Sequence, residues 1–144
     1  MATAVFPGSF DPFTAGHEAI LRRVLPLFDR VYVAVGVNSE KHYMFSPEER
    51  LSLIRRTLAD CPTAVAVSYD GMTIDLCHTL GAQAIIRGIR TAKDLEYEQT
   101  IAAVNRLQDP SIETLLVMAD PEHVNISSTL ERERLIHQCN CPTT

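Results

Sequence analysis

Short, continuous apolar runs alternate with longer helix-like segments along this chain of 144 residues, and that alternation limits the folds open to it. The apolar runs cover residues 4–6, 31–37, 64–67, 84–86 and 114–118. They lack in-out alternation, which is typical of parallel strands covered on both faces. The segments between them carry apolar residues at helical spacings of three and four: Ile20, Val24 and Leu27, then Leu51, Ile54 and Leu58, then Ile101, Val104 and Leu107. This order predicts an α/β fold, a single-domain, doubly wound Rossmann-like sheet of five parallel strands with helices on both faces.

Local signals predict where several elements begin and end. Ser46-Pro47-Glu48-Glu49 combines an N-cap serine, a proline at the first helical position and a glutamate three residues after the cap, so it predicts a helix start. Pro26 predicts a kink or an end in the first helix, and Gly81 predicts a helix end after Leu80. No internal repeat, low-complexity segment or linker interrupts the sequence, so we expect one domain over residues 1–144.

Composition excludes some functions. The 18 acidic residues outnumber the 13 Lys and Arg, and the net charge of −5 argues against a broad nucleic-acid surface. No apolar run approaches the roughly 18 to 20 residues of a membrane span, and no signal-peptide pattern opens the chain, so we expect a cytoplasmic protein without a membrane partner. Cys61, Cys77, Cys139 and Cys141 follow no structural-zinc spacing, so we expect no protein metal site. The alternative is a site at His137, Cys139 and Cys141.

The segment after the first predicted strand, residues 6–17, has the composition of a phosphate-binding turn. Gly8 allows a ligand to approach the backbone closely. Gly16 and His17 fall where the next helix exposes unpaired N–H groups, which favour anions. The alternative interpretation is an ordinary strand-to-helix loop.

Basic and hydroxyl side chains follow the other predicted strands. In an open parallel sheet, ligands bind beyond the carboxyl ends of the strands, so the residues after each strand would meet at one edge. The order of elements therefore gathers Lys41, Arg87 and Arg90 with His17 into a local cationic cluster on an acidic chain. The segments concerned are residues 38–42, 71–73, 87–90 and 122–129. Each residue taken alone could instead be solvated or form a cap.

Two parts of the sequence resemble known families. Thr14-Ala15-Gly16-His17 resembles the (T/H)-x-G-H element with which the nucleotidylyltransferase superfamily holds a nucleoside triphosphate for attack at its α-phosphate. A second group of motifs is similar to that of bacterial phosphopantetheine adenylyltransferases: Arg87-Gly88-Ile89-Arg90, Asp94-Leu95-Glu96-Tyr97-Glu98, Asn105-Arg106 and Ile126-Ser127-Ser128-Thr129. The likeness runs from residue 6 to about residue 134.

The resemblance implies transfer of AMP from ATP to 4′-phosphopantetheine, which gives dephospho-coenzyme A and pyrophosphate in coenzyme A biosynthesis. The attack would be direct and in line, without a covalent enzyme intermediate. The nucleophile would be a phosphate monoester with a second pKa of about 6, largely ionised near pH 7, so no general base is required. The protein would need to align two polyanions and to stabilise charge on the α-phosphate and on the leaving group.

The resemblance also implies residue roles. His17 would stabilise the transition state, Lys41 would bridge the two reacting phosphates, and Arg90 would bind the triphosphate, which makes these three the catalytic residues. The residues implied for ATP are Ser9, Phe10, His17, Gly88, Ile89, Arg90, Glu98, His123, Val124, Asn125, Ile126, Ser127, Ser128 and Thr129. Those implied for 4′-phosphopantetheine are Ser9, Lys41, Thr73, Arg87, Ile101 and Asn105, with Arg87 on its phosphate.

The family likeness further implies Mg²⁺ bound with ATP and a homo-oligomer, a hexamer. Two alternatives remain. One is an adenylyltransferase for another phosphate acceptor, such as nicotinamide mononucleotide, against which the block from Arg87 to Glu98 argues. The other is a non-catalytic, nucleotide-binding regulatory module, against which the presence of His17, Lys41 and Arg90 argues.

Overall fold

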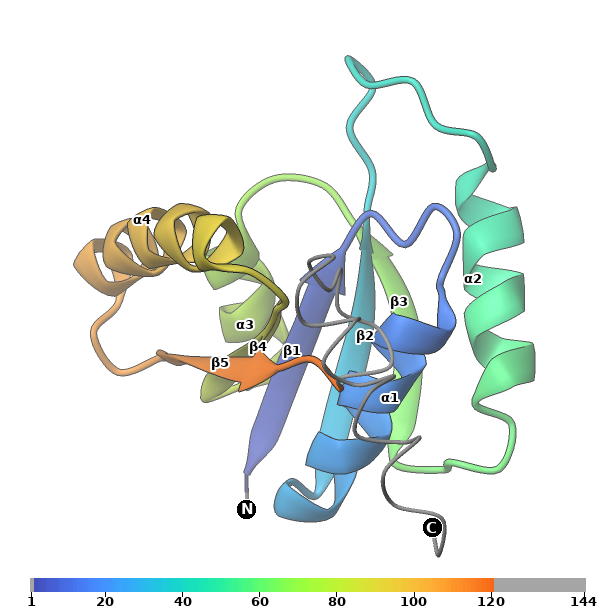
Figure 1. Ribbon diagram of the computed structural model, residues 1–144, viewed down its shortest axis with the longest axis horizontal. Helices are drawn as coiled ribbons and strands as arrows, with labels where there is room; N and C mark the ends of the chain where they lie inside the picture. The colour runs from blue at the N-terminus through green and yellow to red at the C-terminus, as the bar shows by residue number, and fades with distance from the viewer. Residues whose placement is uncertain (1, 121–144) are drawn as a thin grey trace, which may run out of the picture.

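The chain forms one parallel sheet of five strands: β1 (Thr3–Gly8), β2 (Arg30–Gly36), β3 (Ala64–Tyr69), β4 (Ala84–Ile89) and β5 (Glu113–Met118). The strand order across the sheet is β3-β2-β1-β4-β5 (Figure 1). The structure, a computed structural model, describes residues 2–120. All four pairs of neighbouring strands are parallel, which confirms the predicted α/β fold class.

Helices cover both faces of the sheet: α1 (Ala15–Val24), α2 (Pro47–Thr57), α3 (Thr73–Leu80) and α4 (Ala92–Gln108). Leu21 of α1 and Ile54 of α2 pack with one set of strand side chains, which includes Val33. Ile74 of α3 packs on the other face with Ala34, the neighbour of Val33 in β2. Because successive strand side chains point to opposite faces, a continuous apolar strand supplies both cores.

The predicted element ends are confirmed. Ser46 caps α2: its hydroxyl accepts a hydrogen bond from the Glu49 N–H at 3.1 Å, and the Glu49 carboxylate accepts one from the Ser46 N–H at 3.3 Å. Helix α1 ends at Val24 and passes into a short 3-10 turn, Leu25–Leu27, that contains Pro26. Gly81 ends α3 with a φ of 68°, a left-handed conformation that suits glycine.

One boundary differs from the sequence-based expectation in a way that affects the site. The predicted strand at residues 84–86 continues to Ile89, because the pairing of β4 with β5 runs up to Ile89 and Met118. Arg87 and Gly88 therefore lie within β4 and not in the loop after it. A Cβ at residue 88 would lie 2.4 Å from the Ile20 Cδ1, so the glycine allows α1 to pack closely on this strand.

The strand order creates a crevice between β1 and β4. The chain begins at the centre, builds β2 and β3 to one side, and then crosses over to build β4 and β5 on the other. At such a switch point the loops leave the two central strands in opposite directions, which opens a crevice at their carboxyl ends. Within residues 2–120, no helix is long and apolar enough to cross a membrane.

Candidate active site

Two cavities of about 800 Å³ each lie at the carboxyl ends of β1 and β4. We call them the histidine cavity, which contains His17 and Arg90, and the lysine cavity, which contains Lys41 and Thr73. They share six lining residues, which we call the common wall: Pro7, Gly8, Ser9, Arg87, Tyr97 and Glu98. Two ligands could therefore occupy neighbouring cavities and meet at this wall.

His17 lies in the first turn of α1, at the edge of the histidine cavity. Its Nδ1 accepts a hydrogen bond from the Thr14 N–H at 3.0 Å, and the Thr14 hydroxyl accepts one from the His17 N–H at 3.4 Å. Thr14 and His17 thus form a capping box at the start of α1. Because a backbone N–H can only donate, Nδ1 is unprotonated and the neutral ring carries its proton on Nε2.

The surroundings of His17 favour that neutral ring. Burial, and then the positive charges of Arg90 and Arg87, lower the pKa of His17 below its usual value near 6.5. The ring also packs on the aromatic side chains of Phe10 and Phe13. Near pH 7, His17 therefore presents an N–H donor without a formal charge.

Arg87 forms an ion pair with the buried Glu98 in the common wall. The Arg87 Nε and Nη2 donate to the two Glu98 carboxylate oxygens at 2.8 and 2.7 Å, and Nη1 donates to the Pro7 carbonyl at 2.6 Å. Burial acts against the Arg87 charge, but the hydrogen bonds and charge of Glu98 raise the pKa of Arg87. A guanidinium has five N–H groups, so one remains on each terminal nitrogen for a ligand.

Lys41 and Arg90 are held much more loosely than Arg87. Lys41 is exposed in the segment between β2 and α2 and forms no ion pair within residues 2–120. The Arg90 side chain is 57% exposed, with its Nε 3.6 Å from an Asp94 carboxylate oxygen. These cations can therefore move toward a phosphate group, whereas Arg87 is fixed in the wall.

The structure brings together most of the residues that the sequence predicts for the site. Ser9, Arg87 and Glu98 belong to the common wall, while Phe10, His17, Gly88 and Arg90 line the histidine cavity and Lys41, Thr73, Ile101 and Asn105 line the lysine cavity. Ile89 is 4% exposed and lines neither cavity. The predicted nucleotide contacts His123, Val124, Asn125, Ile126, Ser127, Ser128 and Thr129 lie outside the described residues, as do Cys139 and Cys141.

The carboxylates of the histidine cavity already have partners. Asp11 accepts hydrogen bonds from the Met44 and Phe45 N–H groups, Asp94 from the Arg90 N–H, and Glu98 from Arg87. In the described part of the chain, no group of three or more His, Cys, Asp or Glu side chains is arranged to hold a metal ion. The donor set at the site suits anions better than a protein-bound cation.

Sequence reasoning missed several residues that shape the site. Asp11 lies in the turn of residues 6–17 and Tyr97 in the block from Arg87 to Glu98, but neither pattern indicates a role for these two side chains. No motif points to Arg50, although its spacing of four from Ile54 puts it on the buried face of α2. The same spacing rule that predicted the helix could have identified it as a buried arginine.

The chain is similar in sequence and in fold to known proteins. The family model for cytidylyltransferase-like proteins matches residues 5–134. A phosphopantetheine adenylyltransferase from Flavobacterium psychrophilum is 47% identical over 133 residues, which cover 92% of this chain and 87% of that protein. One from Bacteroides fragilis is 46% identical over 135 residues, 94% of this chain and 89% of the relative. The solved structure of a bifunctional NMN adenylyltransferase/ADP ribose pyrophosphatase from Francisella tularensis is similar in fold, with a TM-score of 0.64 at 19% identity over 94% of this chain and 42% of that one.

Proposed function

The chain belongs to the phosphopantetheine adenylyltransferase family, within the cytidylyltransferase-like group, and we propose that it transfers AMP from ATP to 4′-phosphopantetheine. The products are dephospho-coenzyme A and pyrophosphate. The observation that carries the proposal is the common wall: two cavities of about 800 Å³ meet at one partly buried arginine, with a separate exposed cation on each side. That arrangement suits two phosphate-bearing ligands that react with each other.

In this proposal, ATP occupies the histidine cavity and the acceptor occupies the lysine cavity. Arg87 and Lys41 bind the acceptor phosphate, and Thr73, Ile101 and Asn105 line the path of its pantetheine arm. An oxygen of the acceptor phosphate attacks the α-phosphorus of ATP. The new P–O bond forms as the bond from the α-phosphorus to the β-phosphate oxygen breaks, and pyrophosphate leaves with the bonding electrons.

His17 acts in this step as a hydrogen-bond donor and not as a base. Its Nδ1 is committed to Thr14, so Nε2–H donates to an α-phosphate oxygen as charge accumulates there. Arg90 binds the triphosphate through its exposed side chain. The acceptor phosphate is already ionised near pH 7, so the reaction needs no proton acceptor from the protein.

Magnesium enters as part of the nucleotide substrate. The carboxylates of the histidine cavity are engaged by backbone N–H groups and arginines, so we propose that triphosphate oxygens and water hold the ion. A reaction that consumes ATP and supplies coenzyme A synthesis also suits the cytoplasm.

We further propose that copies of the chain associate, as a hexamer by family likeness. Large apolar side chains are exposed on the edge strand β5 and on α4: Leu115, Leu116 and Met118, then Leu95, Val104 and Leu107. Leu116 and Met118 lie on one face of β5, and exposed apolar side chains that gather on a surface often mark a protein–protein contact. A second copy of this chain is the partner that we propose.

Pyrophosphate release tests the function. The purified protein is given ATP and Mg²⁺ with 4′-phosphopantetheine, with nicotinamide mononucleotide or with no acceptor. We expect release only with 4′-phosphopantetheine, with dephospho-coenzyme A identified by its mass. Release only with nicotinamide mononucleotide would support AMP transfer but would show that the proposed acceptor is wrong. No release from a folded sample that binds ATP would favour a regulatory module.

A further inference from the structure

The segment that carries Lys41, residues 37–46, has no helix or strand of its own. Its residues from Asn38 to His42 are exposed, and in its second half Tyr43, Phe45 and Ser46 are partly buried. A lysine in such a segment would explore many positions, and ordering it costs conformational entropy. Contacts from other elements must therefore fix this segment.

Asp11 supplies the first of those contacts. It belongs to the turn between β1 and α1, yet its two carboxylate oxygens accept hydrogen bonds from the Met44 N–H at 2.6 Å and the Phe45 N–H at 2.8 Å. These N–H groups lie three and four positions after Lys41. A carboxylate that receives two backbone donors makes strong, charge-assisted hydrogen bonds, so Asp11 ties the end of the segment to the β1–α1 turn.

Arg50 supplies the second contact from the first turn of α2. Its Nη1 donates to the Ser9 carbonyl at 2.8 Å and to the Gly36 carbonyl at 3.1 Å. Its guanidinium carbon lies 4.0 Å from the centre of the Tyr43 ring, and the Tyr43 hydroxyl accepts a hydrogen bond from the Asn38 N–H at 3.1 Å. One arginine thus touches the β1–α1 turn, the end of β2 and the middle of the segment.

Stability alone does not account for Arg50. Its side chain is 1% exposed, it forms no ion pair with a carboxylate within residues 2–120, and its Nε and Nη2 have no hydrogen-bond partner there. A buried charge without a counter-charge is costly, and an apolar side chain of similar volume is often tolerated as well or better. A residue of this kind is more readily explained by what it holds in place.

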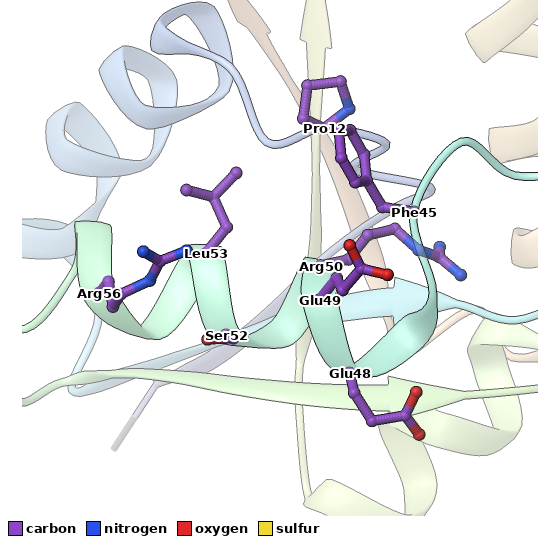
Figure 2. A pocket seen from close by; sticks show the side chains of 8 residues that line it. All are labelled: Pro12, Phe45, Glu48, Glu49, Arg50, Ser52, Leu53 and Arg56. Carbon is purple, nitrogen blue, oxygen red and sulfur yellow. The ribbon is translucent and has the colours of Figure 1, made fainter.

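We propose that Asp11 and Arg50 are positioning residues, which hold the segment 37–46 against the β1–α1 turn so that Lys41 and Ser9 face the same phosphate. The inference rests on the proposed function and adds to it, because it concerns residues that need not touch either substrate. Figure 2 shows the two segments meeting over α2, where Pro12 and Phe45 lie together near Glu49 and Arg50. These residues line a separate cavity of about 350 Å³.

The test compares Asp11→Asn, Arg50→Met and Arg50→Lys with a matched control, Arg56→Met. Arg56 lies on the same helix, is exposed, and forms no ion pair in the described part of the chain. Asparagine removes one of the two acceptors of Asp11, methionine removes the charge of Arg50, and lysine keeps the charge but loses the planar fork. Three quantities are measured for each variant: kcat, the dissociation constant of ATP by calorimetry, and hydrogen exchange of the amides in residues 37–46.

We expect Asp11→Asn and Arg50→Met to lower kcat by about 10- to 100-fold, because a misplacement near 1 Å can cost that much in rate. The ATP dissociation constant should stay within about threefold, because the segment 37–46 lines the lysine cavity, and Asp11, which lines the histidine cavity, has both carboxylate oxygens engaged by the Met44 and Phe45 N–H groups. Amides of residues 37–46 should exchange about tenfold faster or more, with those of α3 unchanged. Arg50→Lys should remain impaired, because geometry and not charge alone carries the effect. Arg56→Met should match the wild type in all three measurements.

Unchanged exchange in residues 37–46 of both Asp11→Asn and Arg50→Met would overturn the proposal. A loss of kcat that is fully explained by a smaller folded fraction would also overturn the proposal. So would a loss of ATP affinity as large as the loss of kcat. Full recovery in Arg50→Lys would show that the charge suffices and would overturn the positioning role of Arg50. If the wild type transfers AMP to a different phosphate acceptor, the proposed substrate is wrong but the positioning role is not yet contradicted. The same kcat comparison is then made with that acceptor.

Discussion

The imidazole ring of His17 has two separate roles. Its Nδ1 completes the cap of α1 by accepting a hydrogen bond from the Thr14 N–H, and in the proposed reaction its Nε2–H donates to the α-phosphate. A substitution that removes the whole ring therefore confuses helix stability with catalysis. Glutamine at the third helical position can still complete a capping box, so it can separate the two roles.

We predict that His17→Gln lowers kcat by about 100-fold or more, because the glutamine oxygen would be held by the Thr14 N–H and its flexible amide N–H would replace the fixed imidazole Nε2–H, which acts on charge that develops only in the transition state. ATP affinity should stay within several-fold, and the melting temperature should remain close to that of the wild type. Steady-state kinetics, calorimetry and thermal denaturation measure these quantities. An ATP affinity that falls as much as kcat would instead assign His17 to ground-state binding.

The sequence predicts the residues of the site better than their partners. His17, Lys41, Arg87 and Arg90 were recognised because cations after parallel strands meet at one edge. The pairing of Glu98 with Arg87 was not predicted, because it depends on how α4 lies over β4, and Glu98 was assigned only to the nucleotide. That assignment and the other contacts carried over from the family stay predictions.

Among the elements, the segments with a clear apolar pattern were predicted, and the polar first part of α4 was not. The apolar runs predicted all five strands. Strand β4 continues past its run, because Arg87 and Gly88, which suggest a loop, still pair with β5. Helix α4 begins at Ala92, before the apolar spacing that starts at Ile101. Its buried residue in this first part is Glu98, which an apolar pattern cannot show.

The packing of α1 on β4 gives a prediction at this scale. We predict that Gly88→Ala destabilises the fold by about 1 kcal/mol or more, since the added Cβ would overlap the buried Ile20 Cδ1 and overpacking carries such costs. Ile20→Val removes that Cδ1, so the loss from Gly88→Ala should be smaller in the Ile20→Val background. Urea unfolding of the four proteins measures the coupling. Strictly additive losses would show that the side chain of Ile20 moves aside freely.

The junction of α3 with the turn after α4 gives a pH-dependent prediction. Asp109 accepts hydrogen bonds from the Ser111 N–H and hydroxyl and lies 2.6 Å from the His78 Nε2. The His78 contact, and then Ser111, lower the pKa of Asp109 from 3.8 to about 2. The fold favours the ionised carboxylate, so its stabilisation is complete above about pH 4 and is lost as pH falls through 2.

We therefore expect the wild type to have a higher melting temperature than Asp109→Asn at pH 5 to 6. This difference in melting temperature should narrow below about pH 4. Thermal denaturation across that range measures the gap, and an NMR titration of the Asp109 carboxyl should give an apparent pKa near 2. A constant gap from pH 6 to pH 2.5 would show that the hydrogen bonds of Asp109 do not depend on its ionisation.

At the scale of the whole molecule, the sequence predicted the class of the fold but not the arrangement of its strands. Alternating strands and helices imply a parallel sheet, yet periodicity is silent on whether β4 pairs with β1 or with β3. That choice is made by packing between distant segments, such as Gln83 with Thr3. The common wall exists only because β1 and β4 are neighbours, so its two-sided geometry could not be predicted.

The proposed assembly is tested on the exposed face of β5. We predict that Leu116→Glu lowers the mass measured by light scattering toward that of a single chain, because a charge cannot be buried unpaired in an apolar contact. Leu27→Glu is the matched control, since Leu27 is 71% exposed but belongs to the 3-10 turn after α1 and to neither β5 nor α4. A wild type that is already monomeric at micromolar concentration would contradict the proposal.

The pairing of β1 with β4 also determines when the site can form as the chain folds. The hydrogen bond from Arg87 to the Pro7 carbonyl joins residues that are 80 positions apart. Closing so long a loop has an entropic cost, and contacts of this kind form slowly. During synthesis, β2 leaves the ribosome before β4, because it precedes β4 in the chain, so β1 can gain its first neighbour before its second is made. A chain interrupted before residue 84 would contain the β1–α1 turn but lack Arg87, Tyr97 and Glu98, the half of the common wall that comes from β4 and α4.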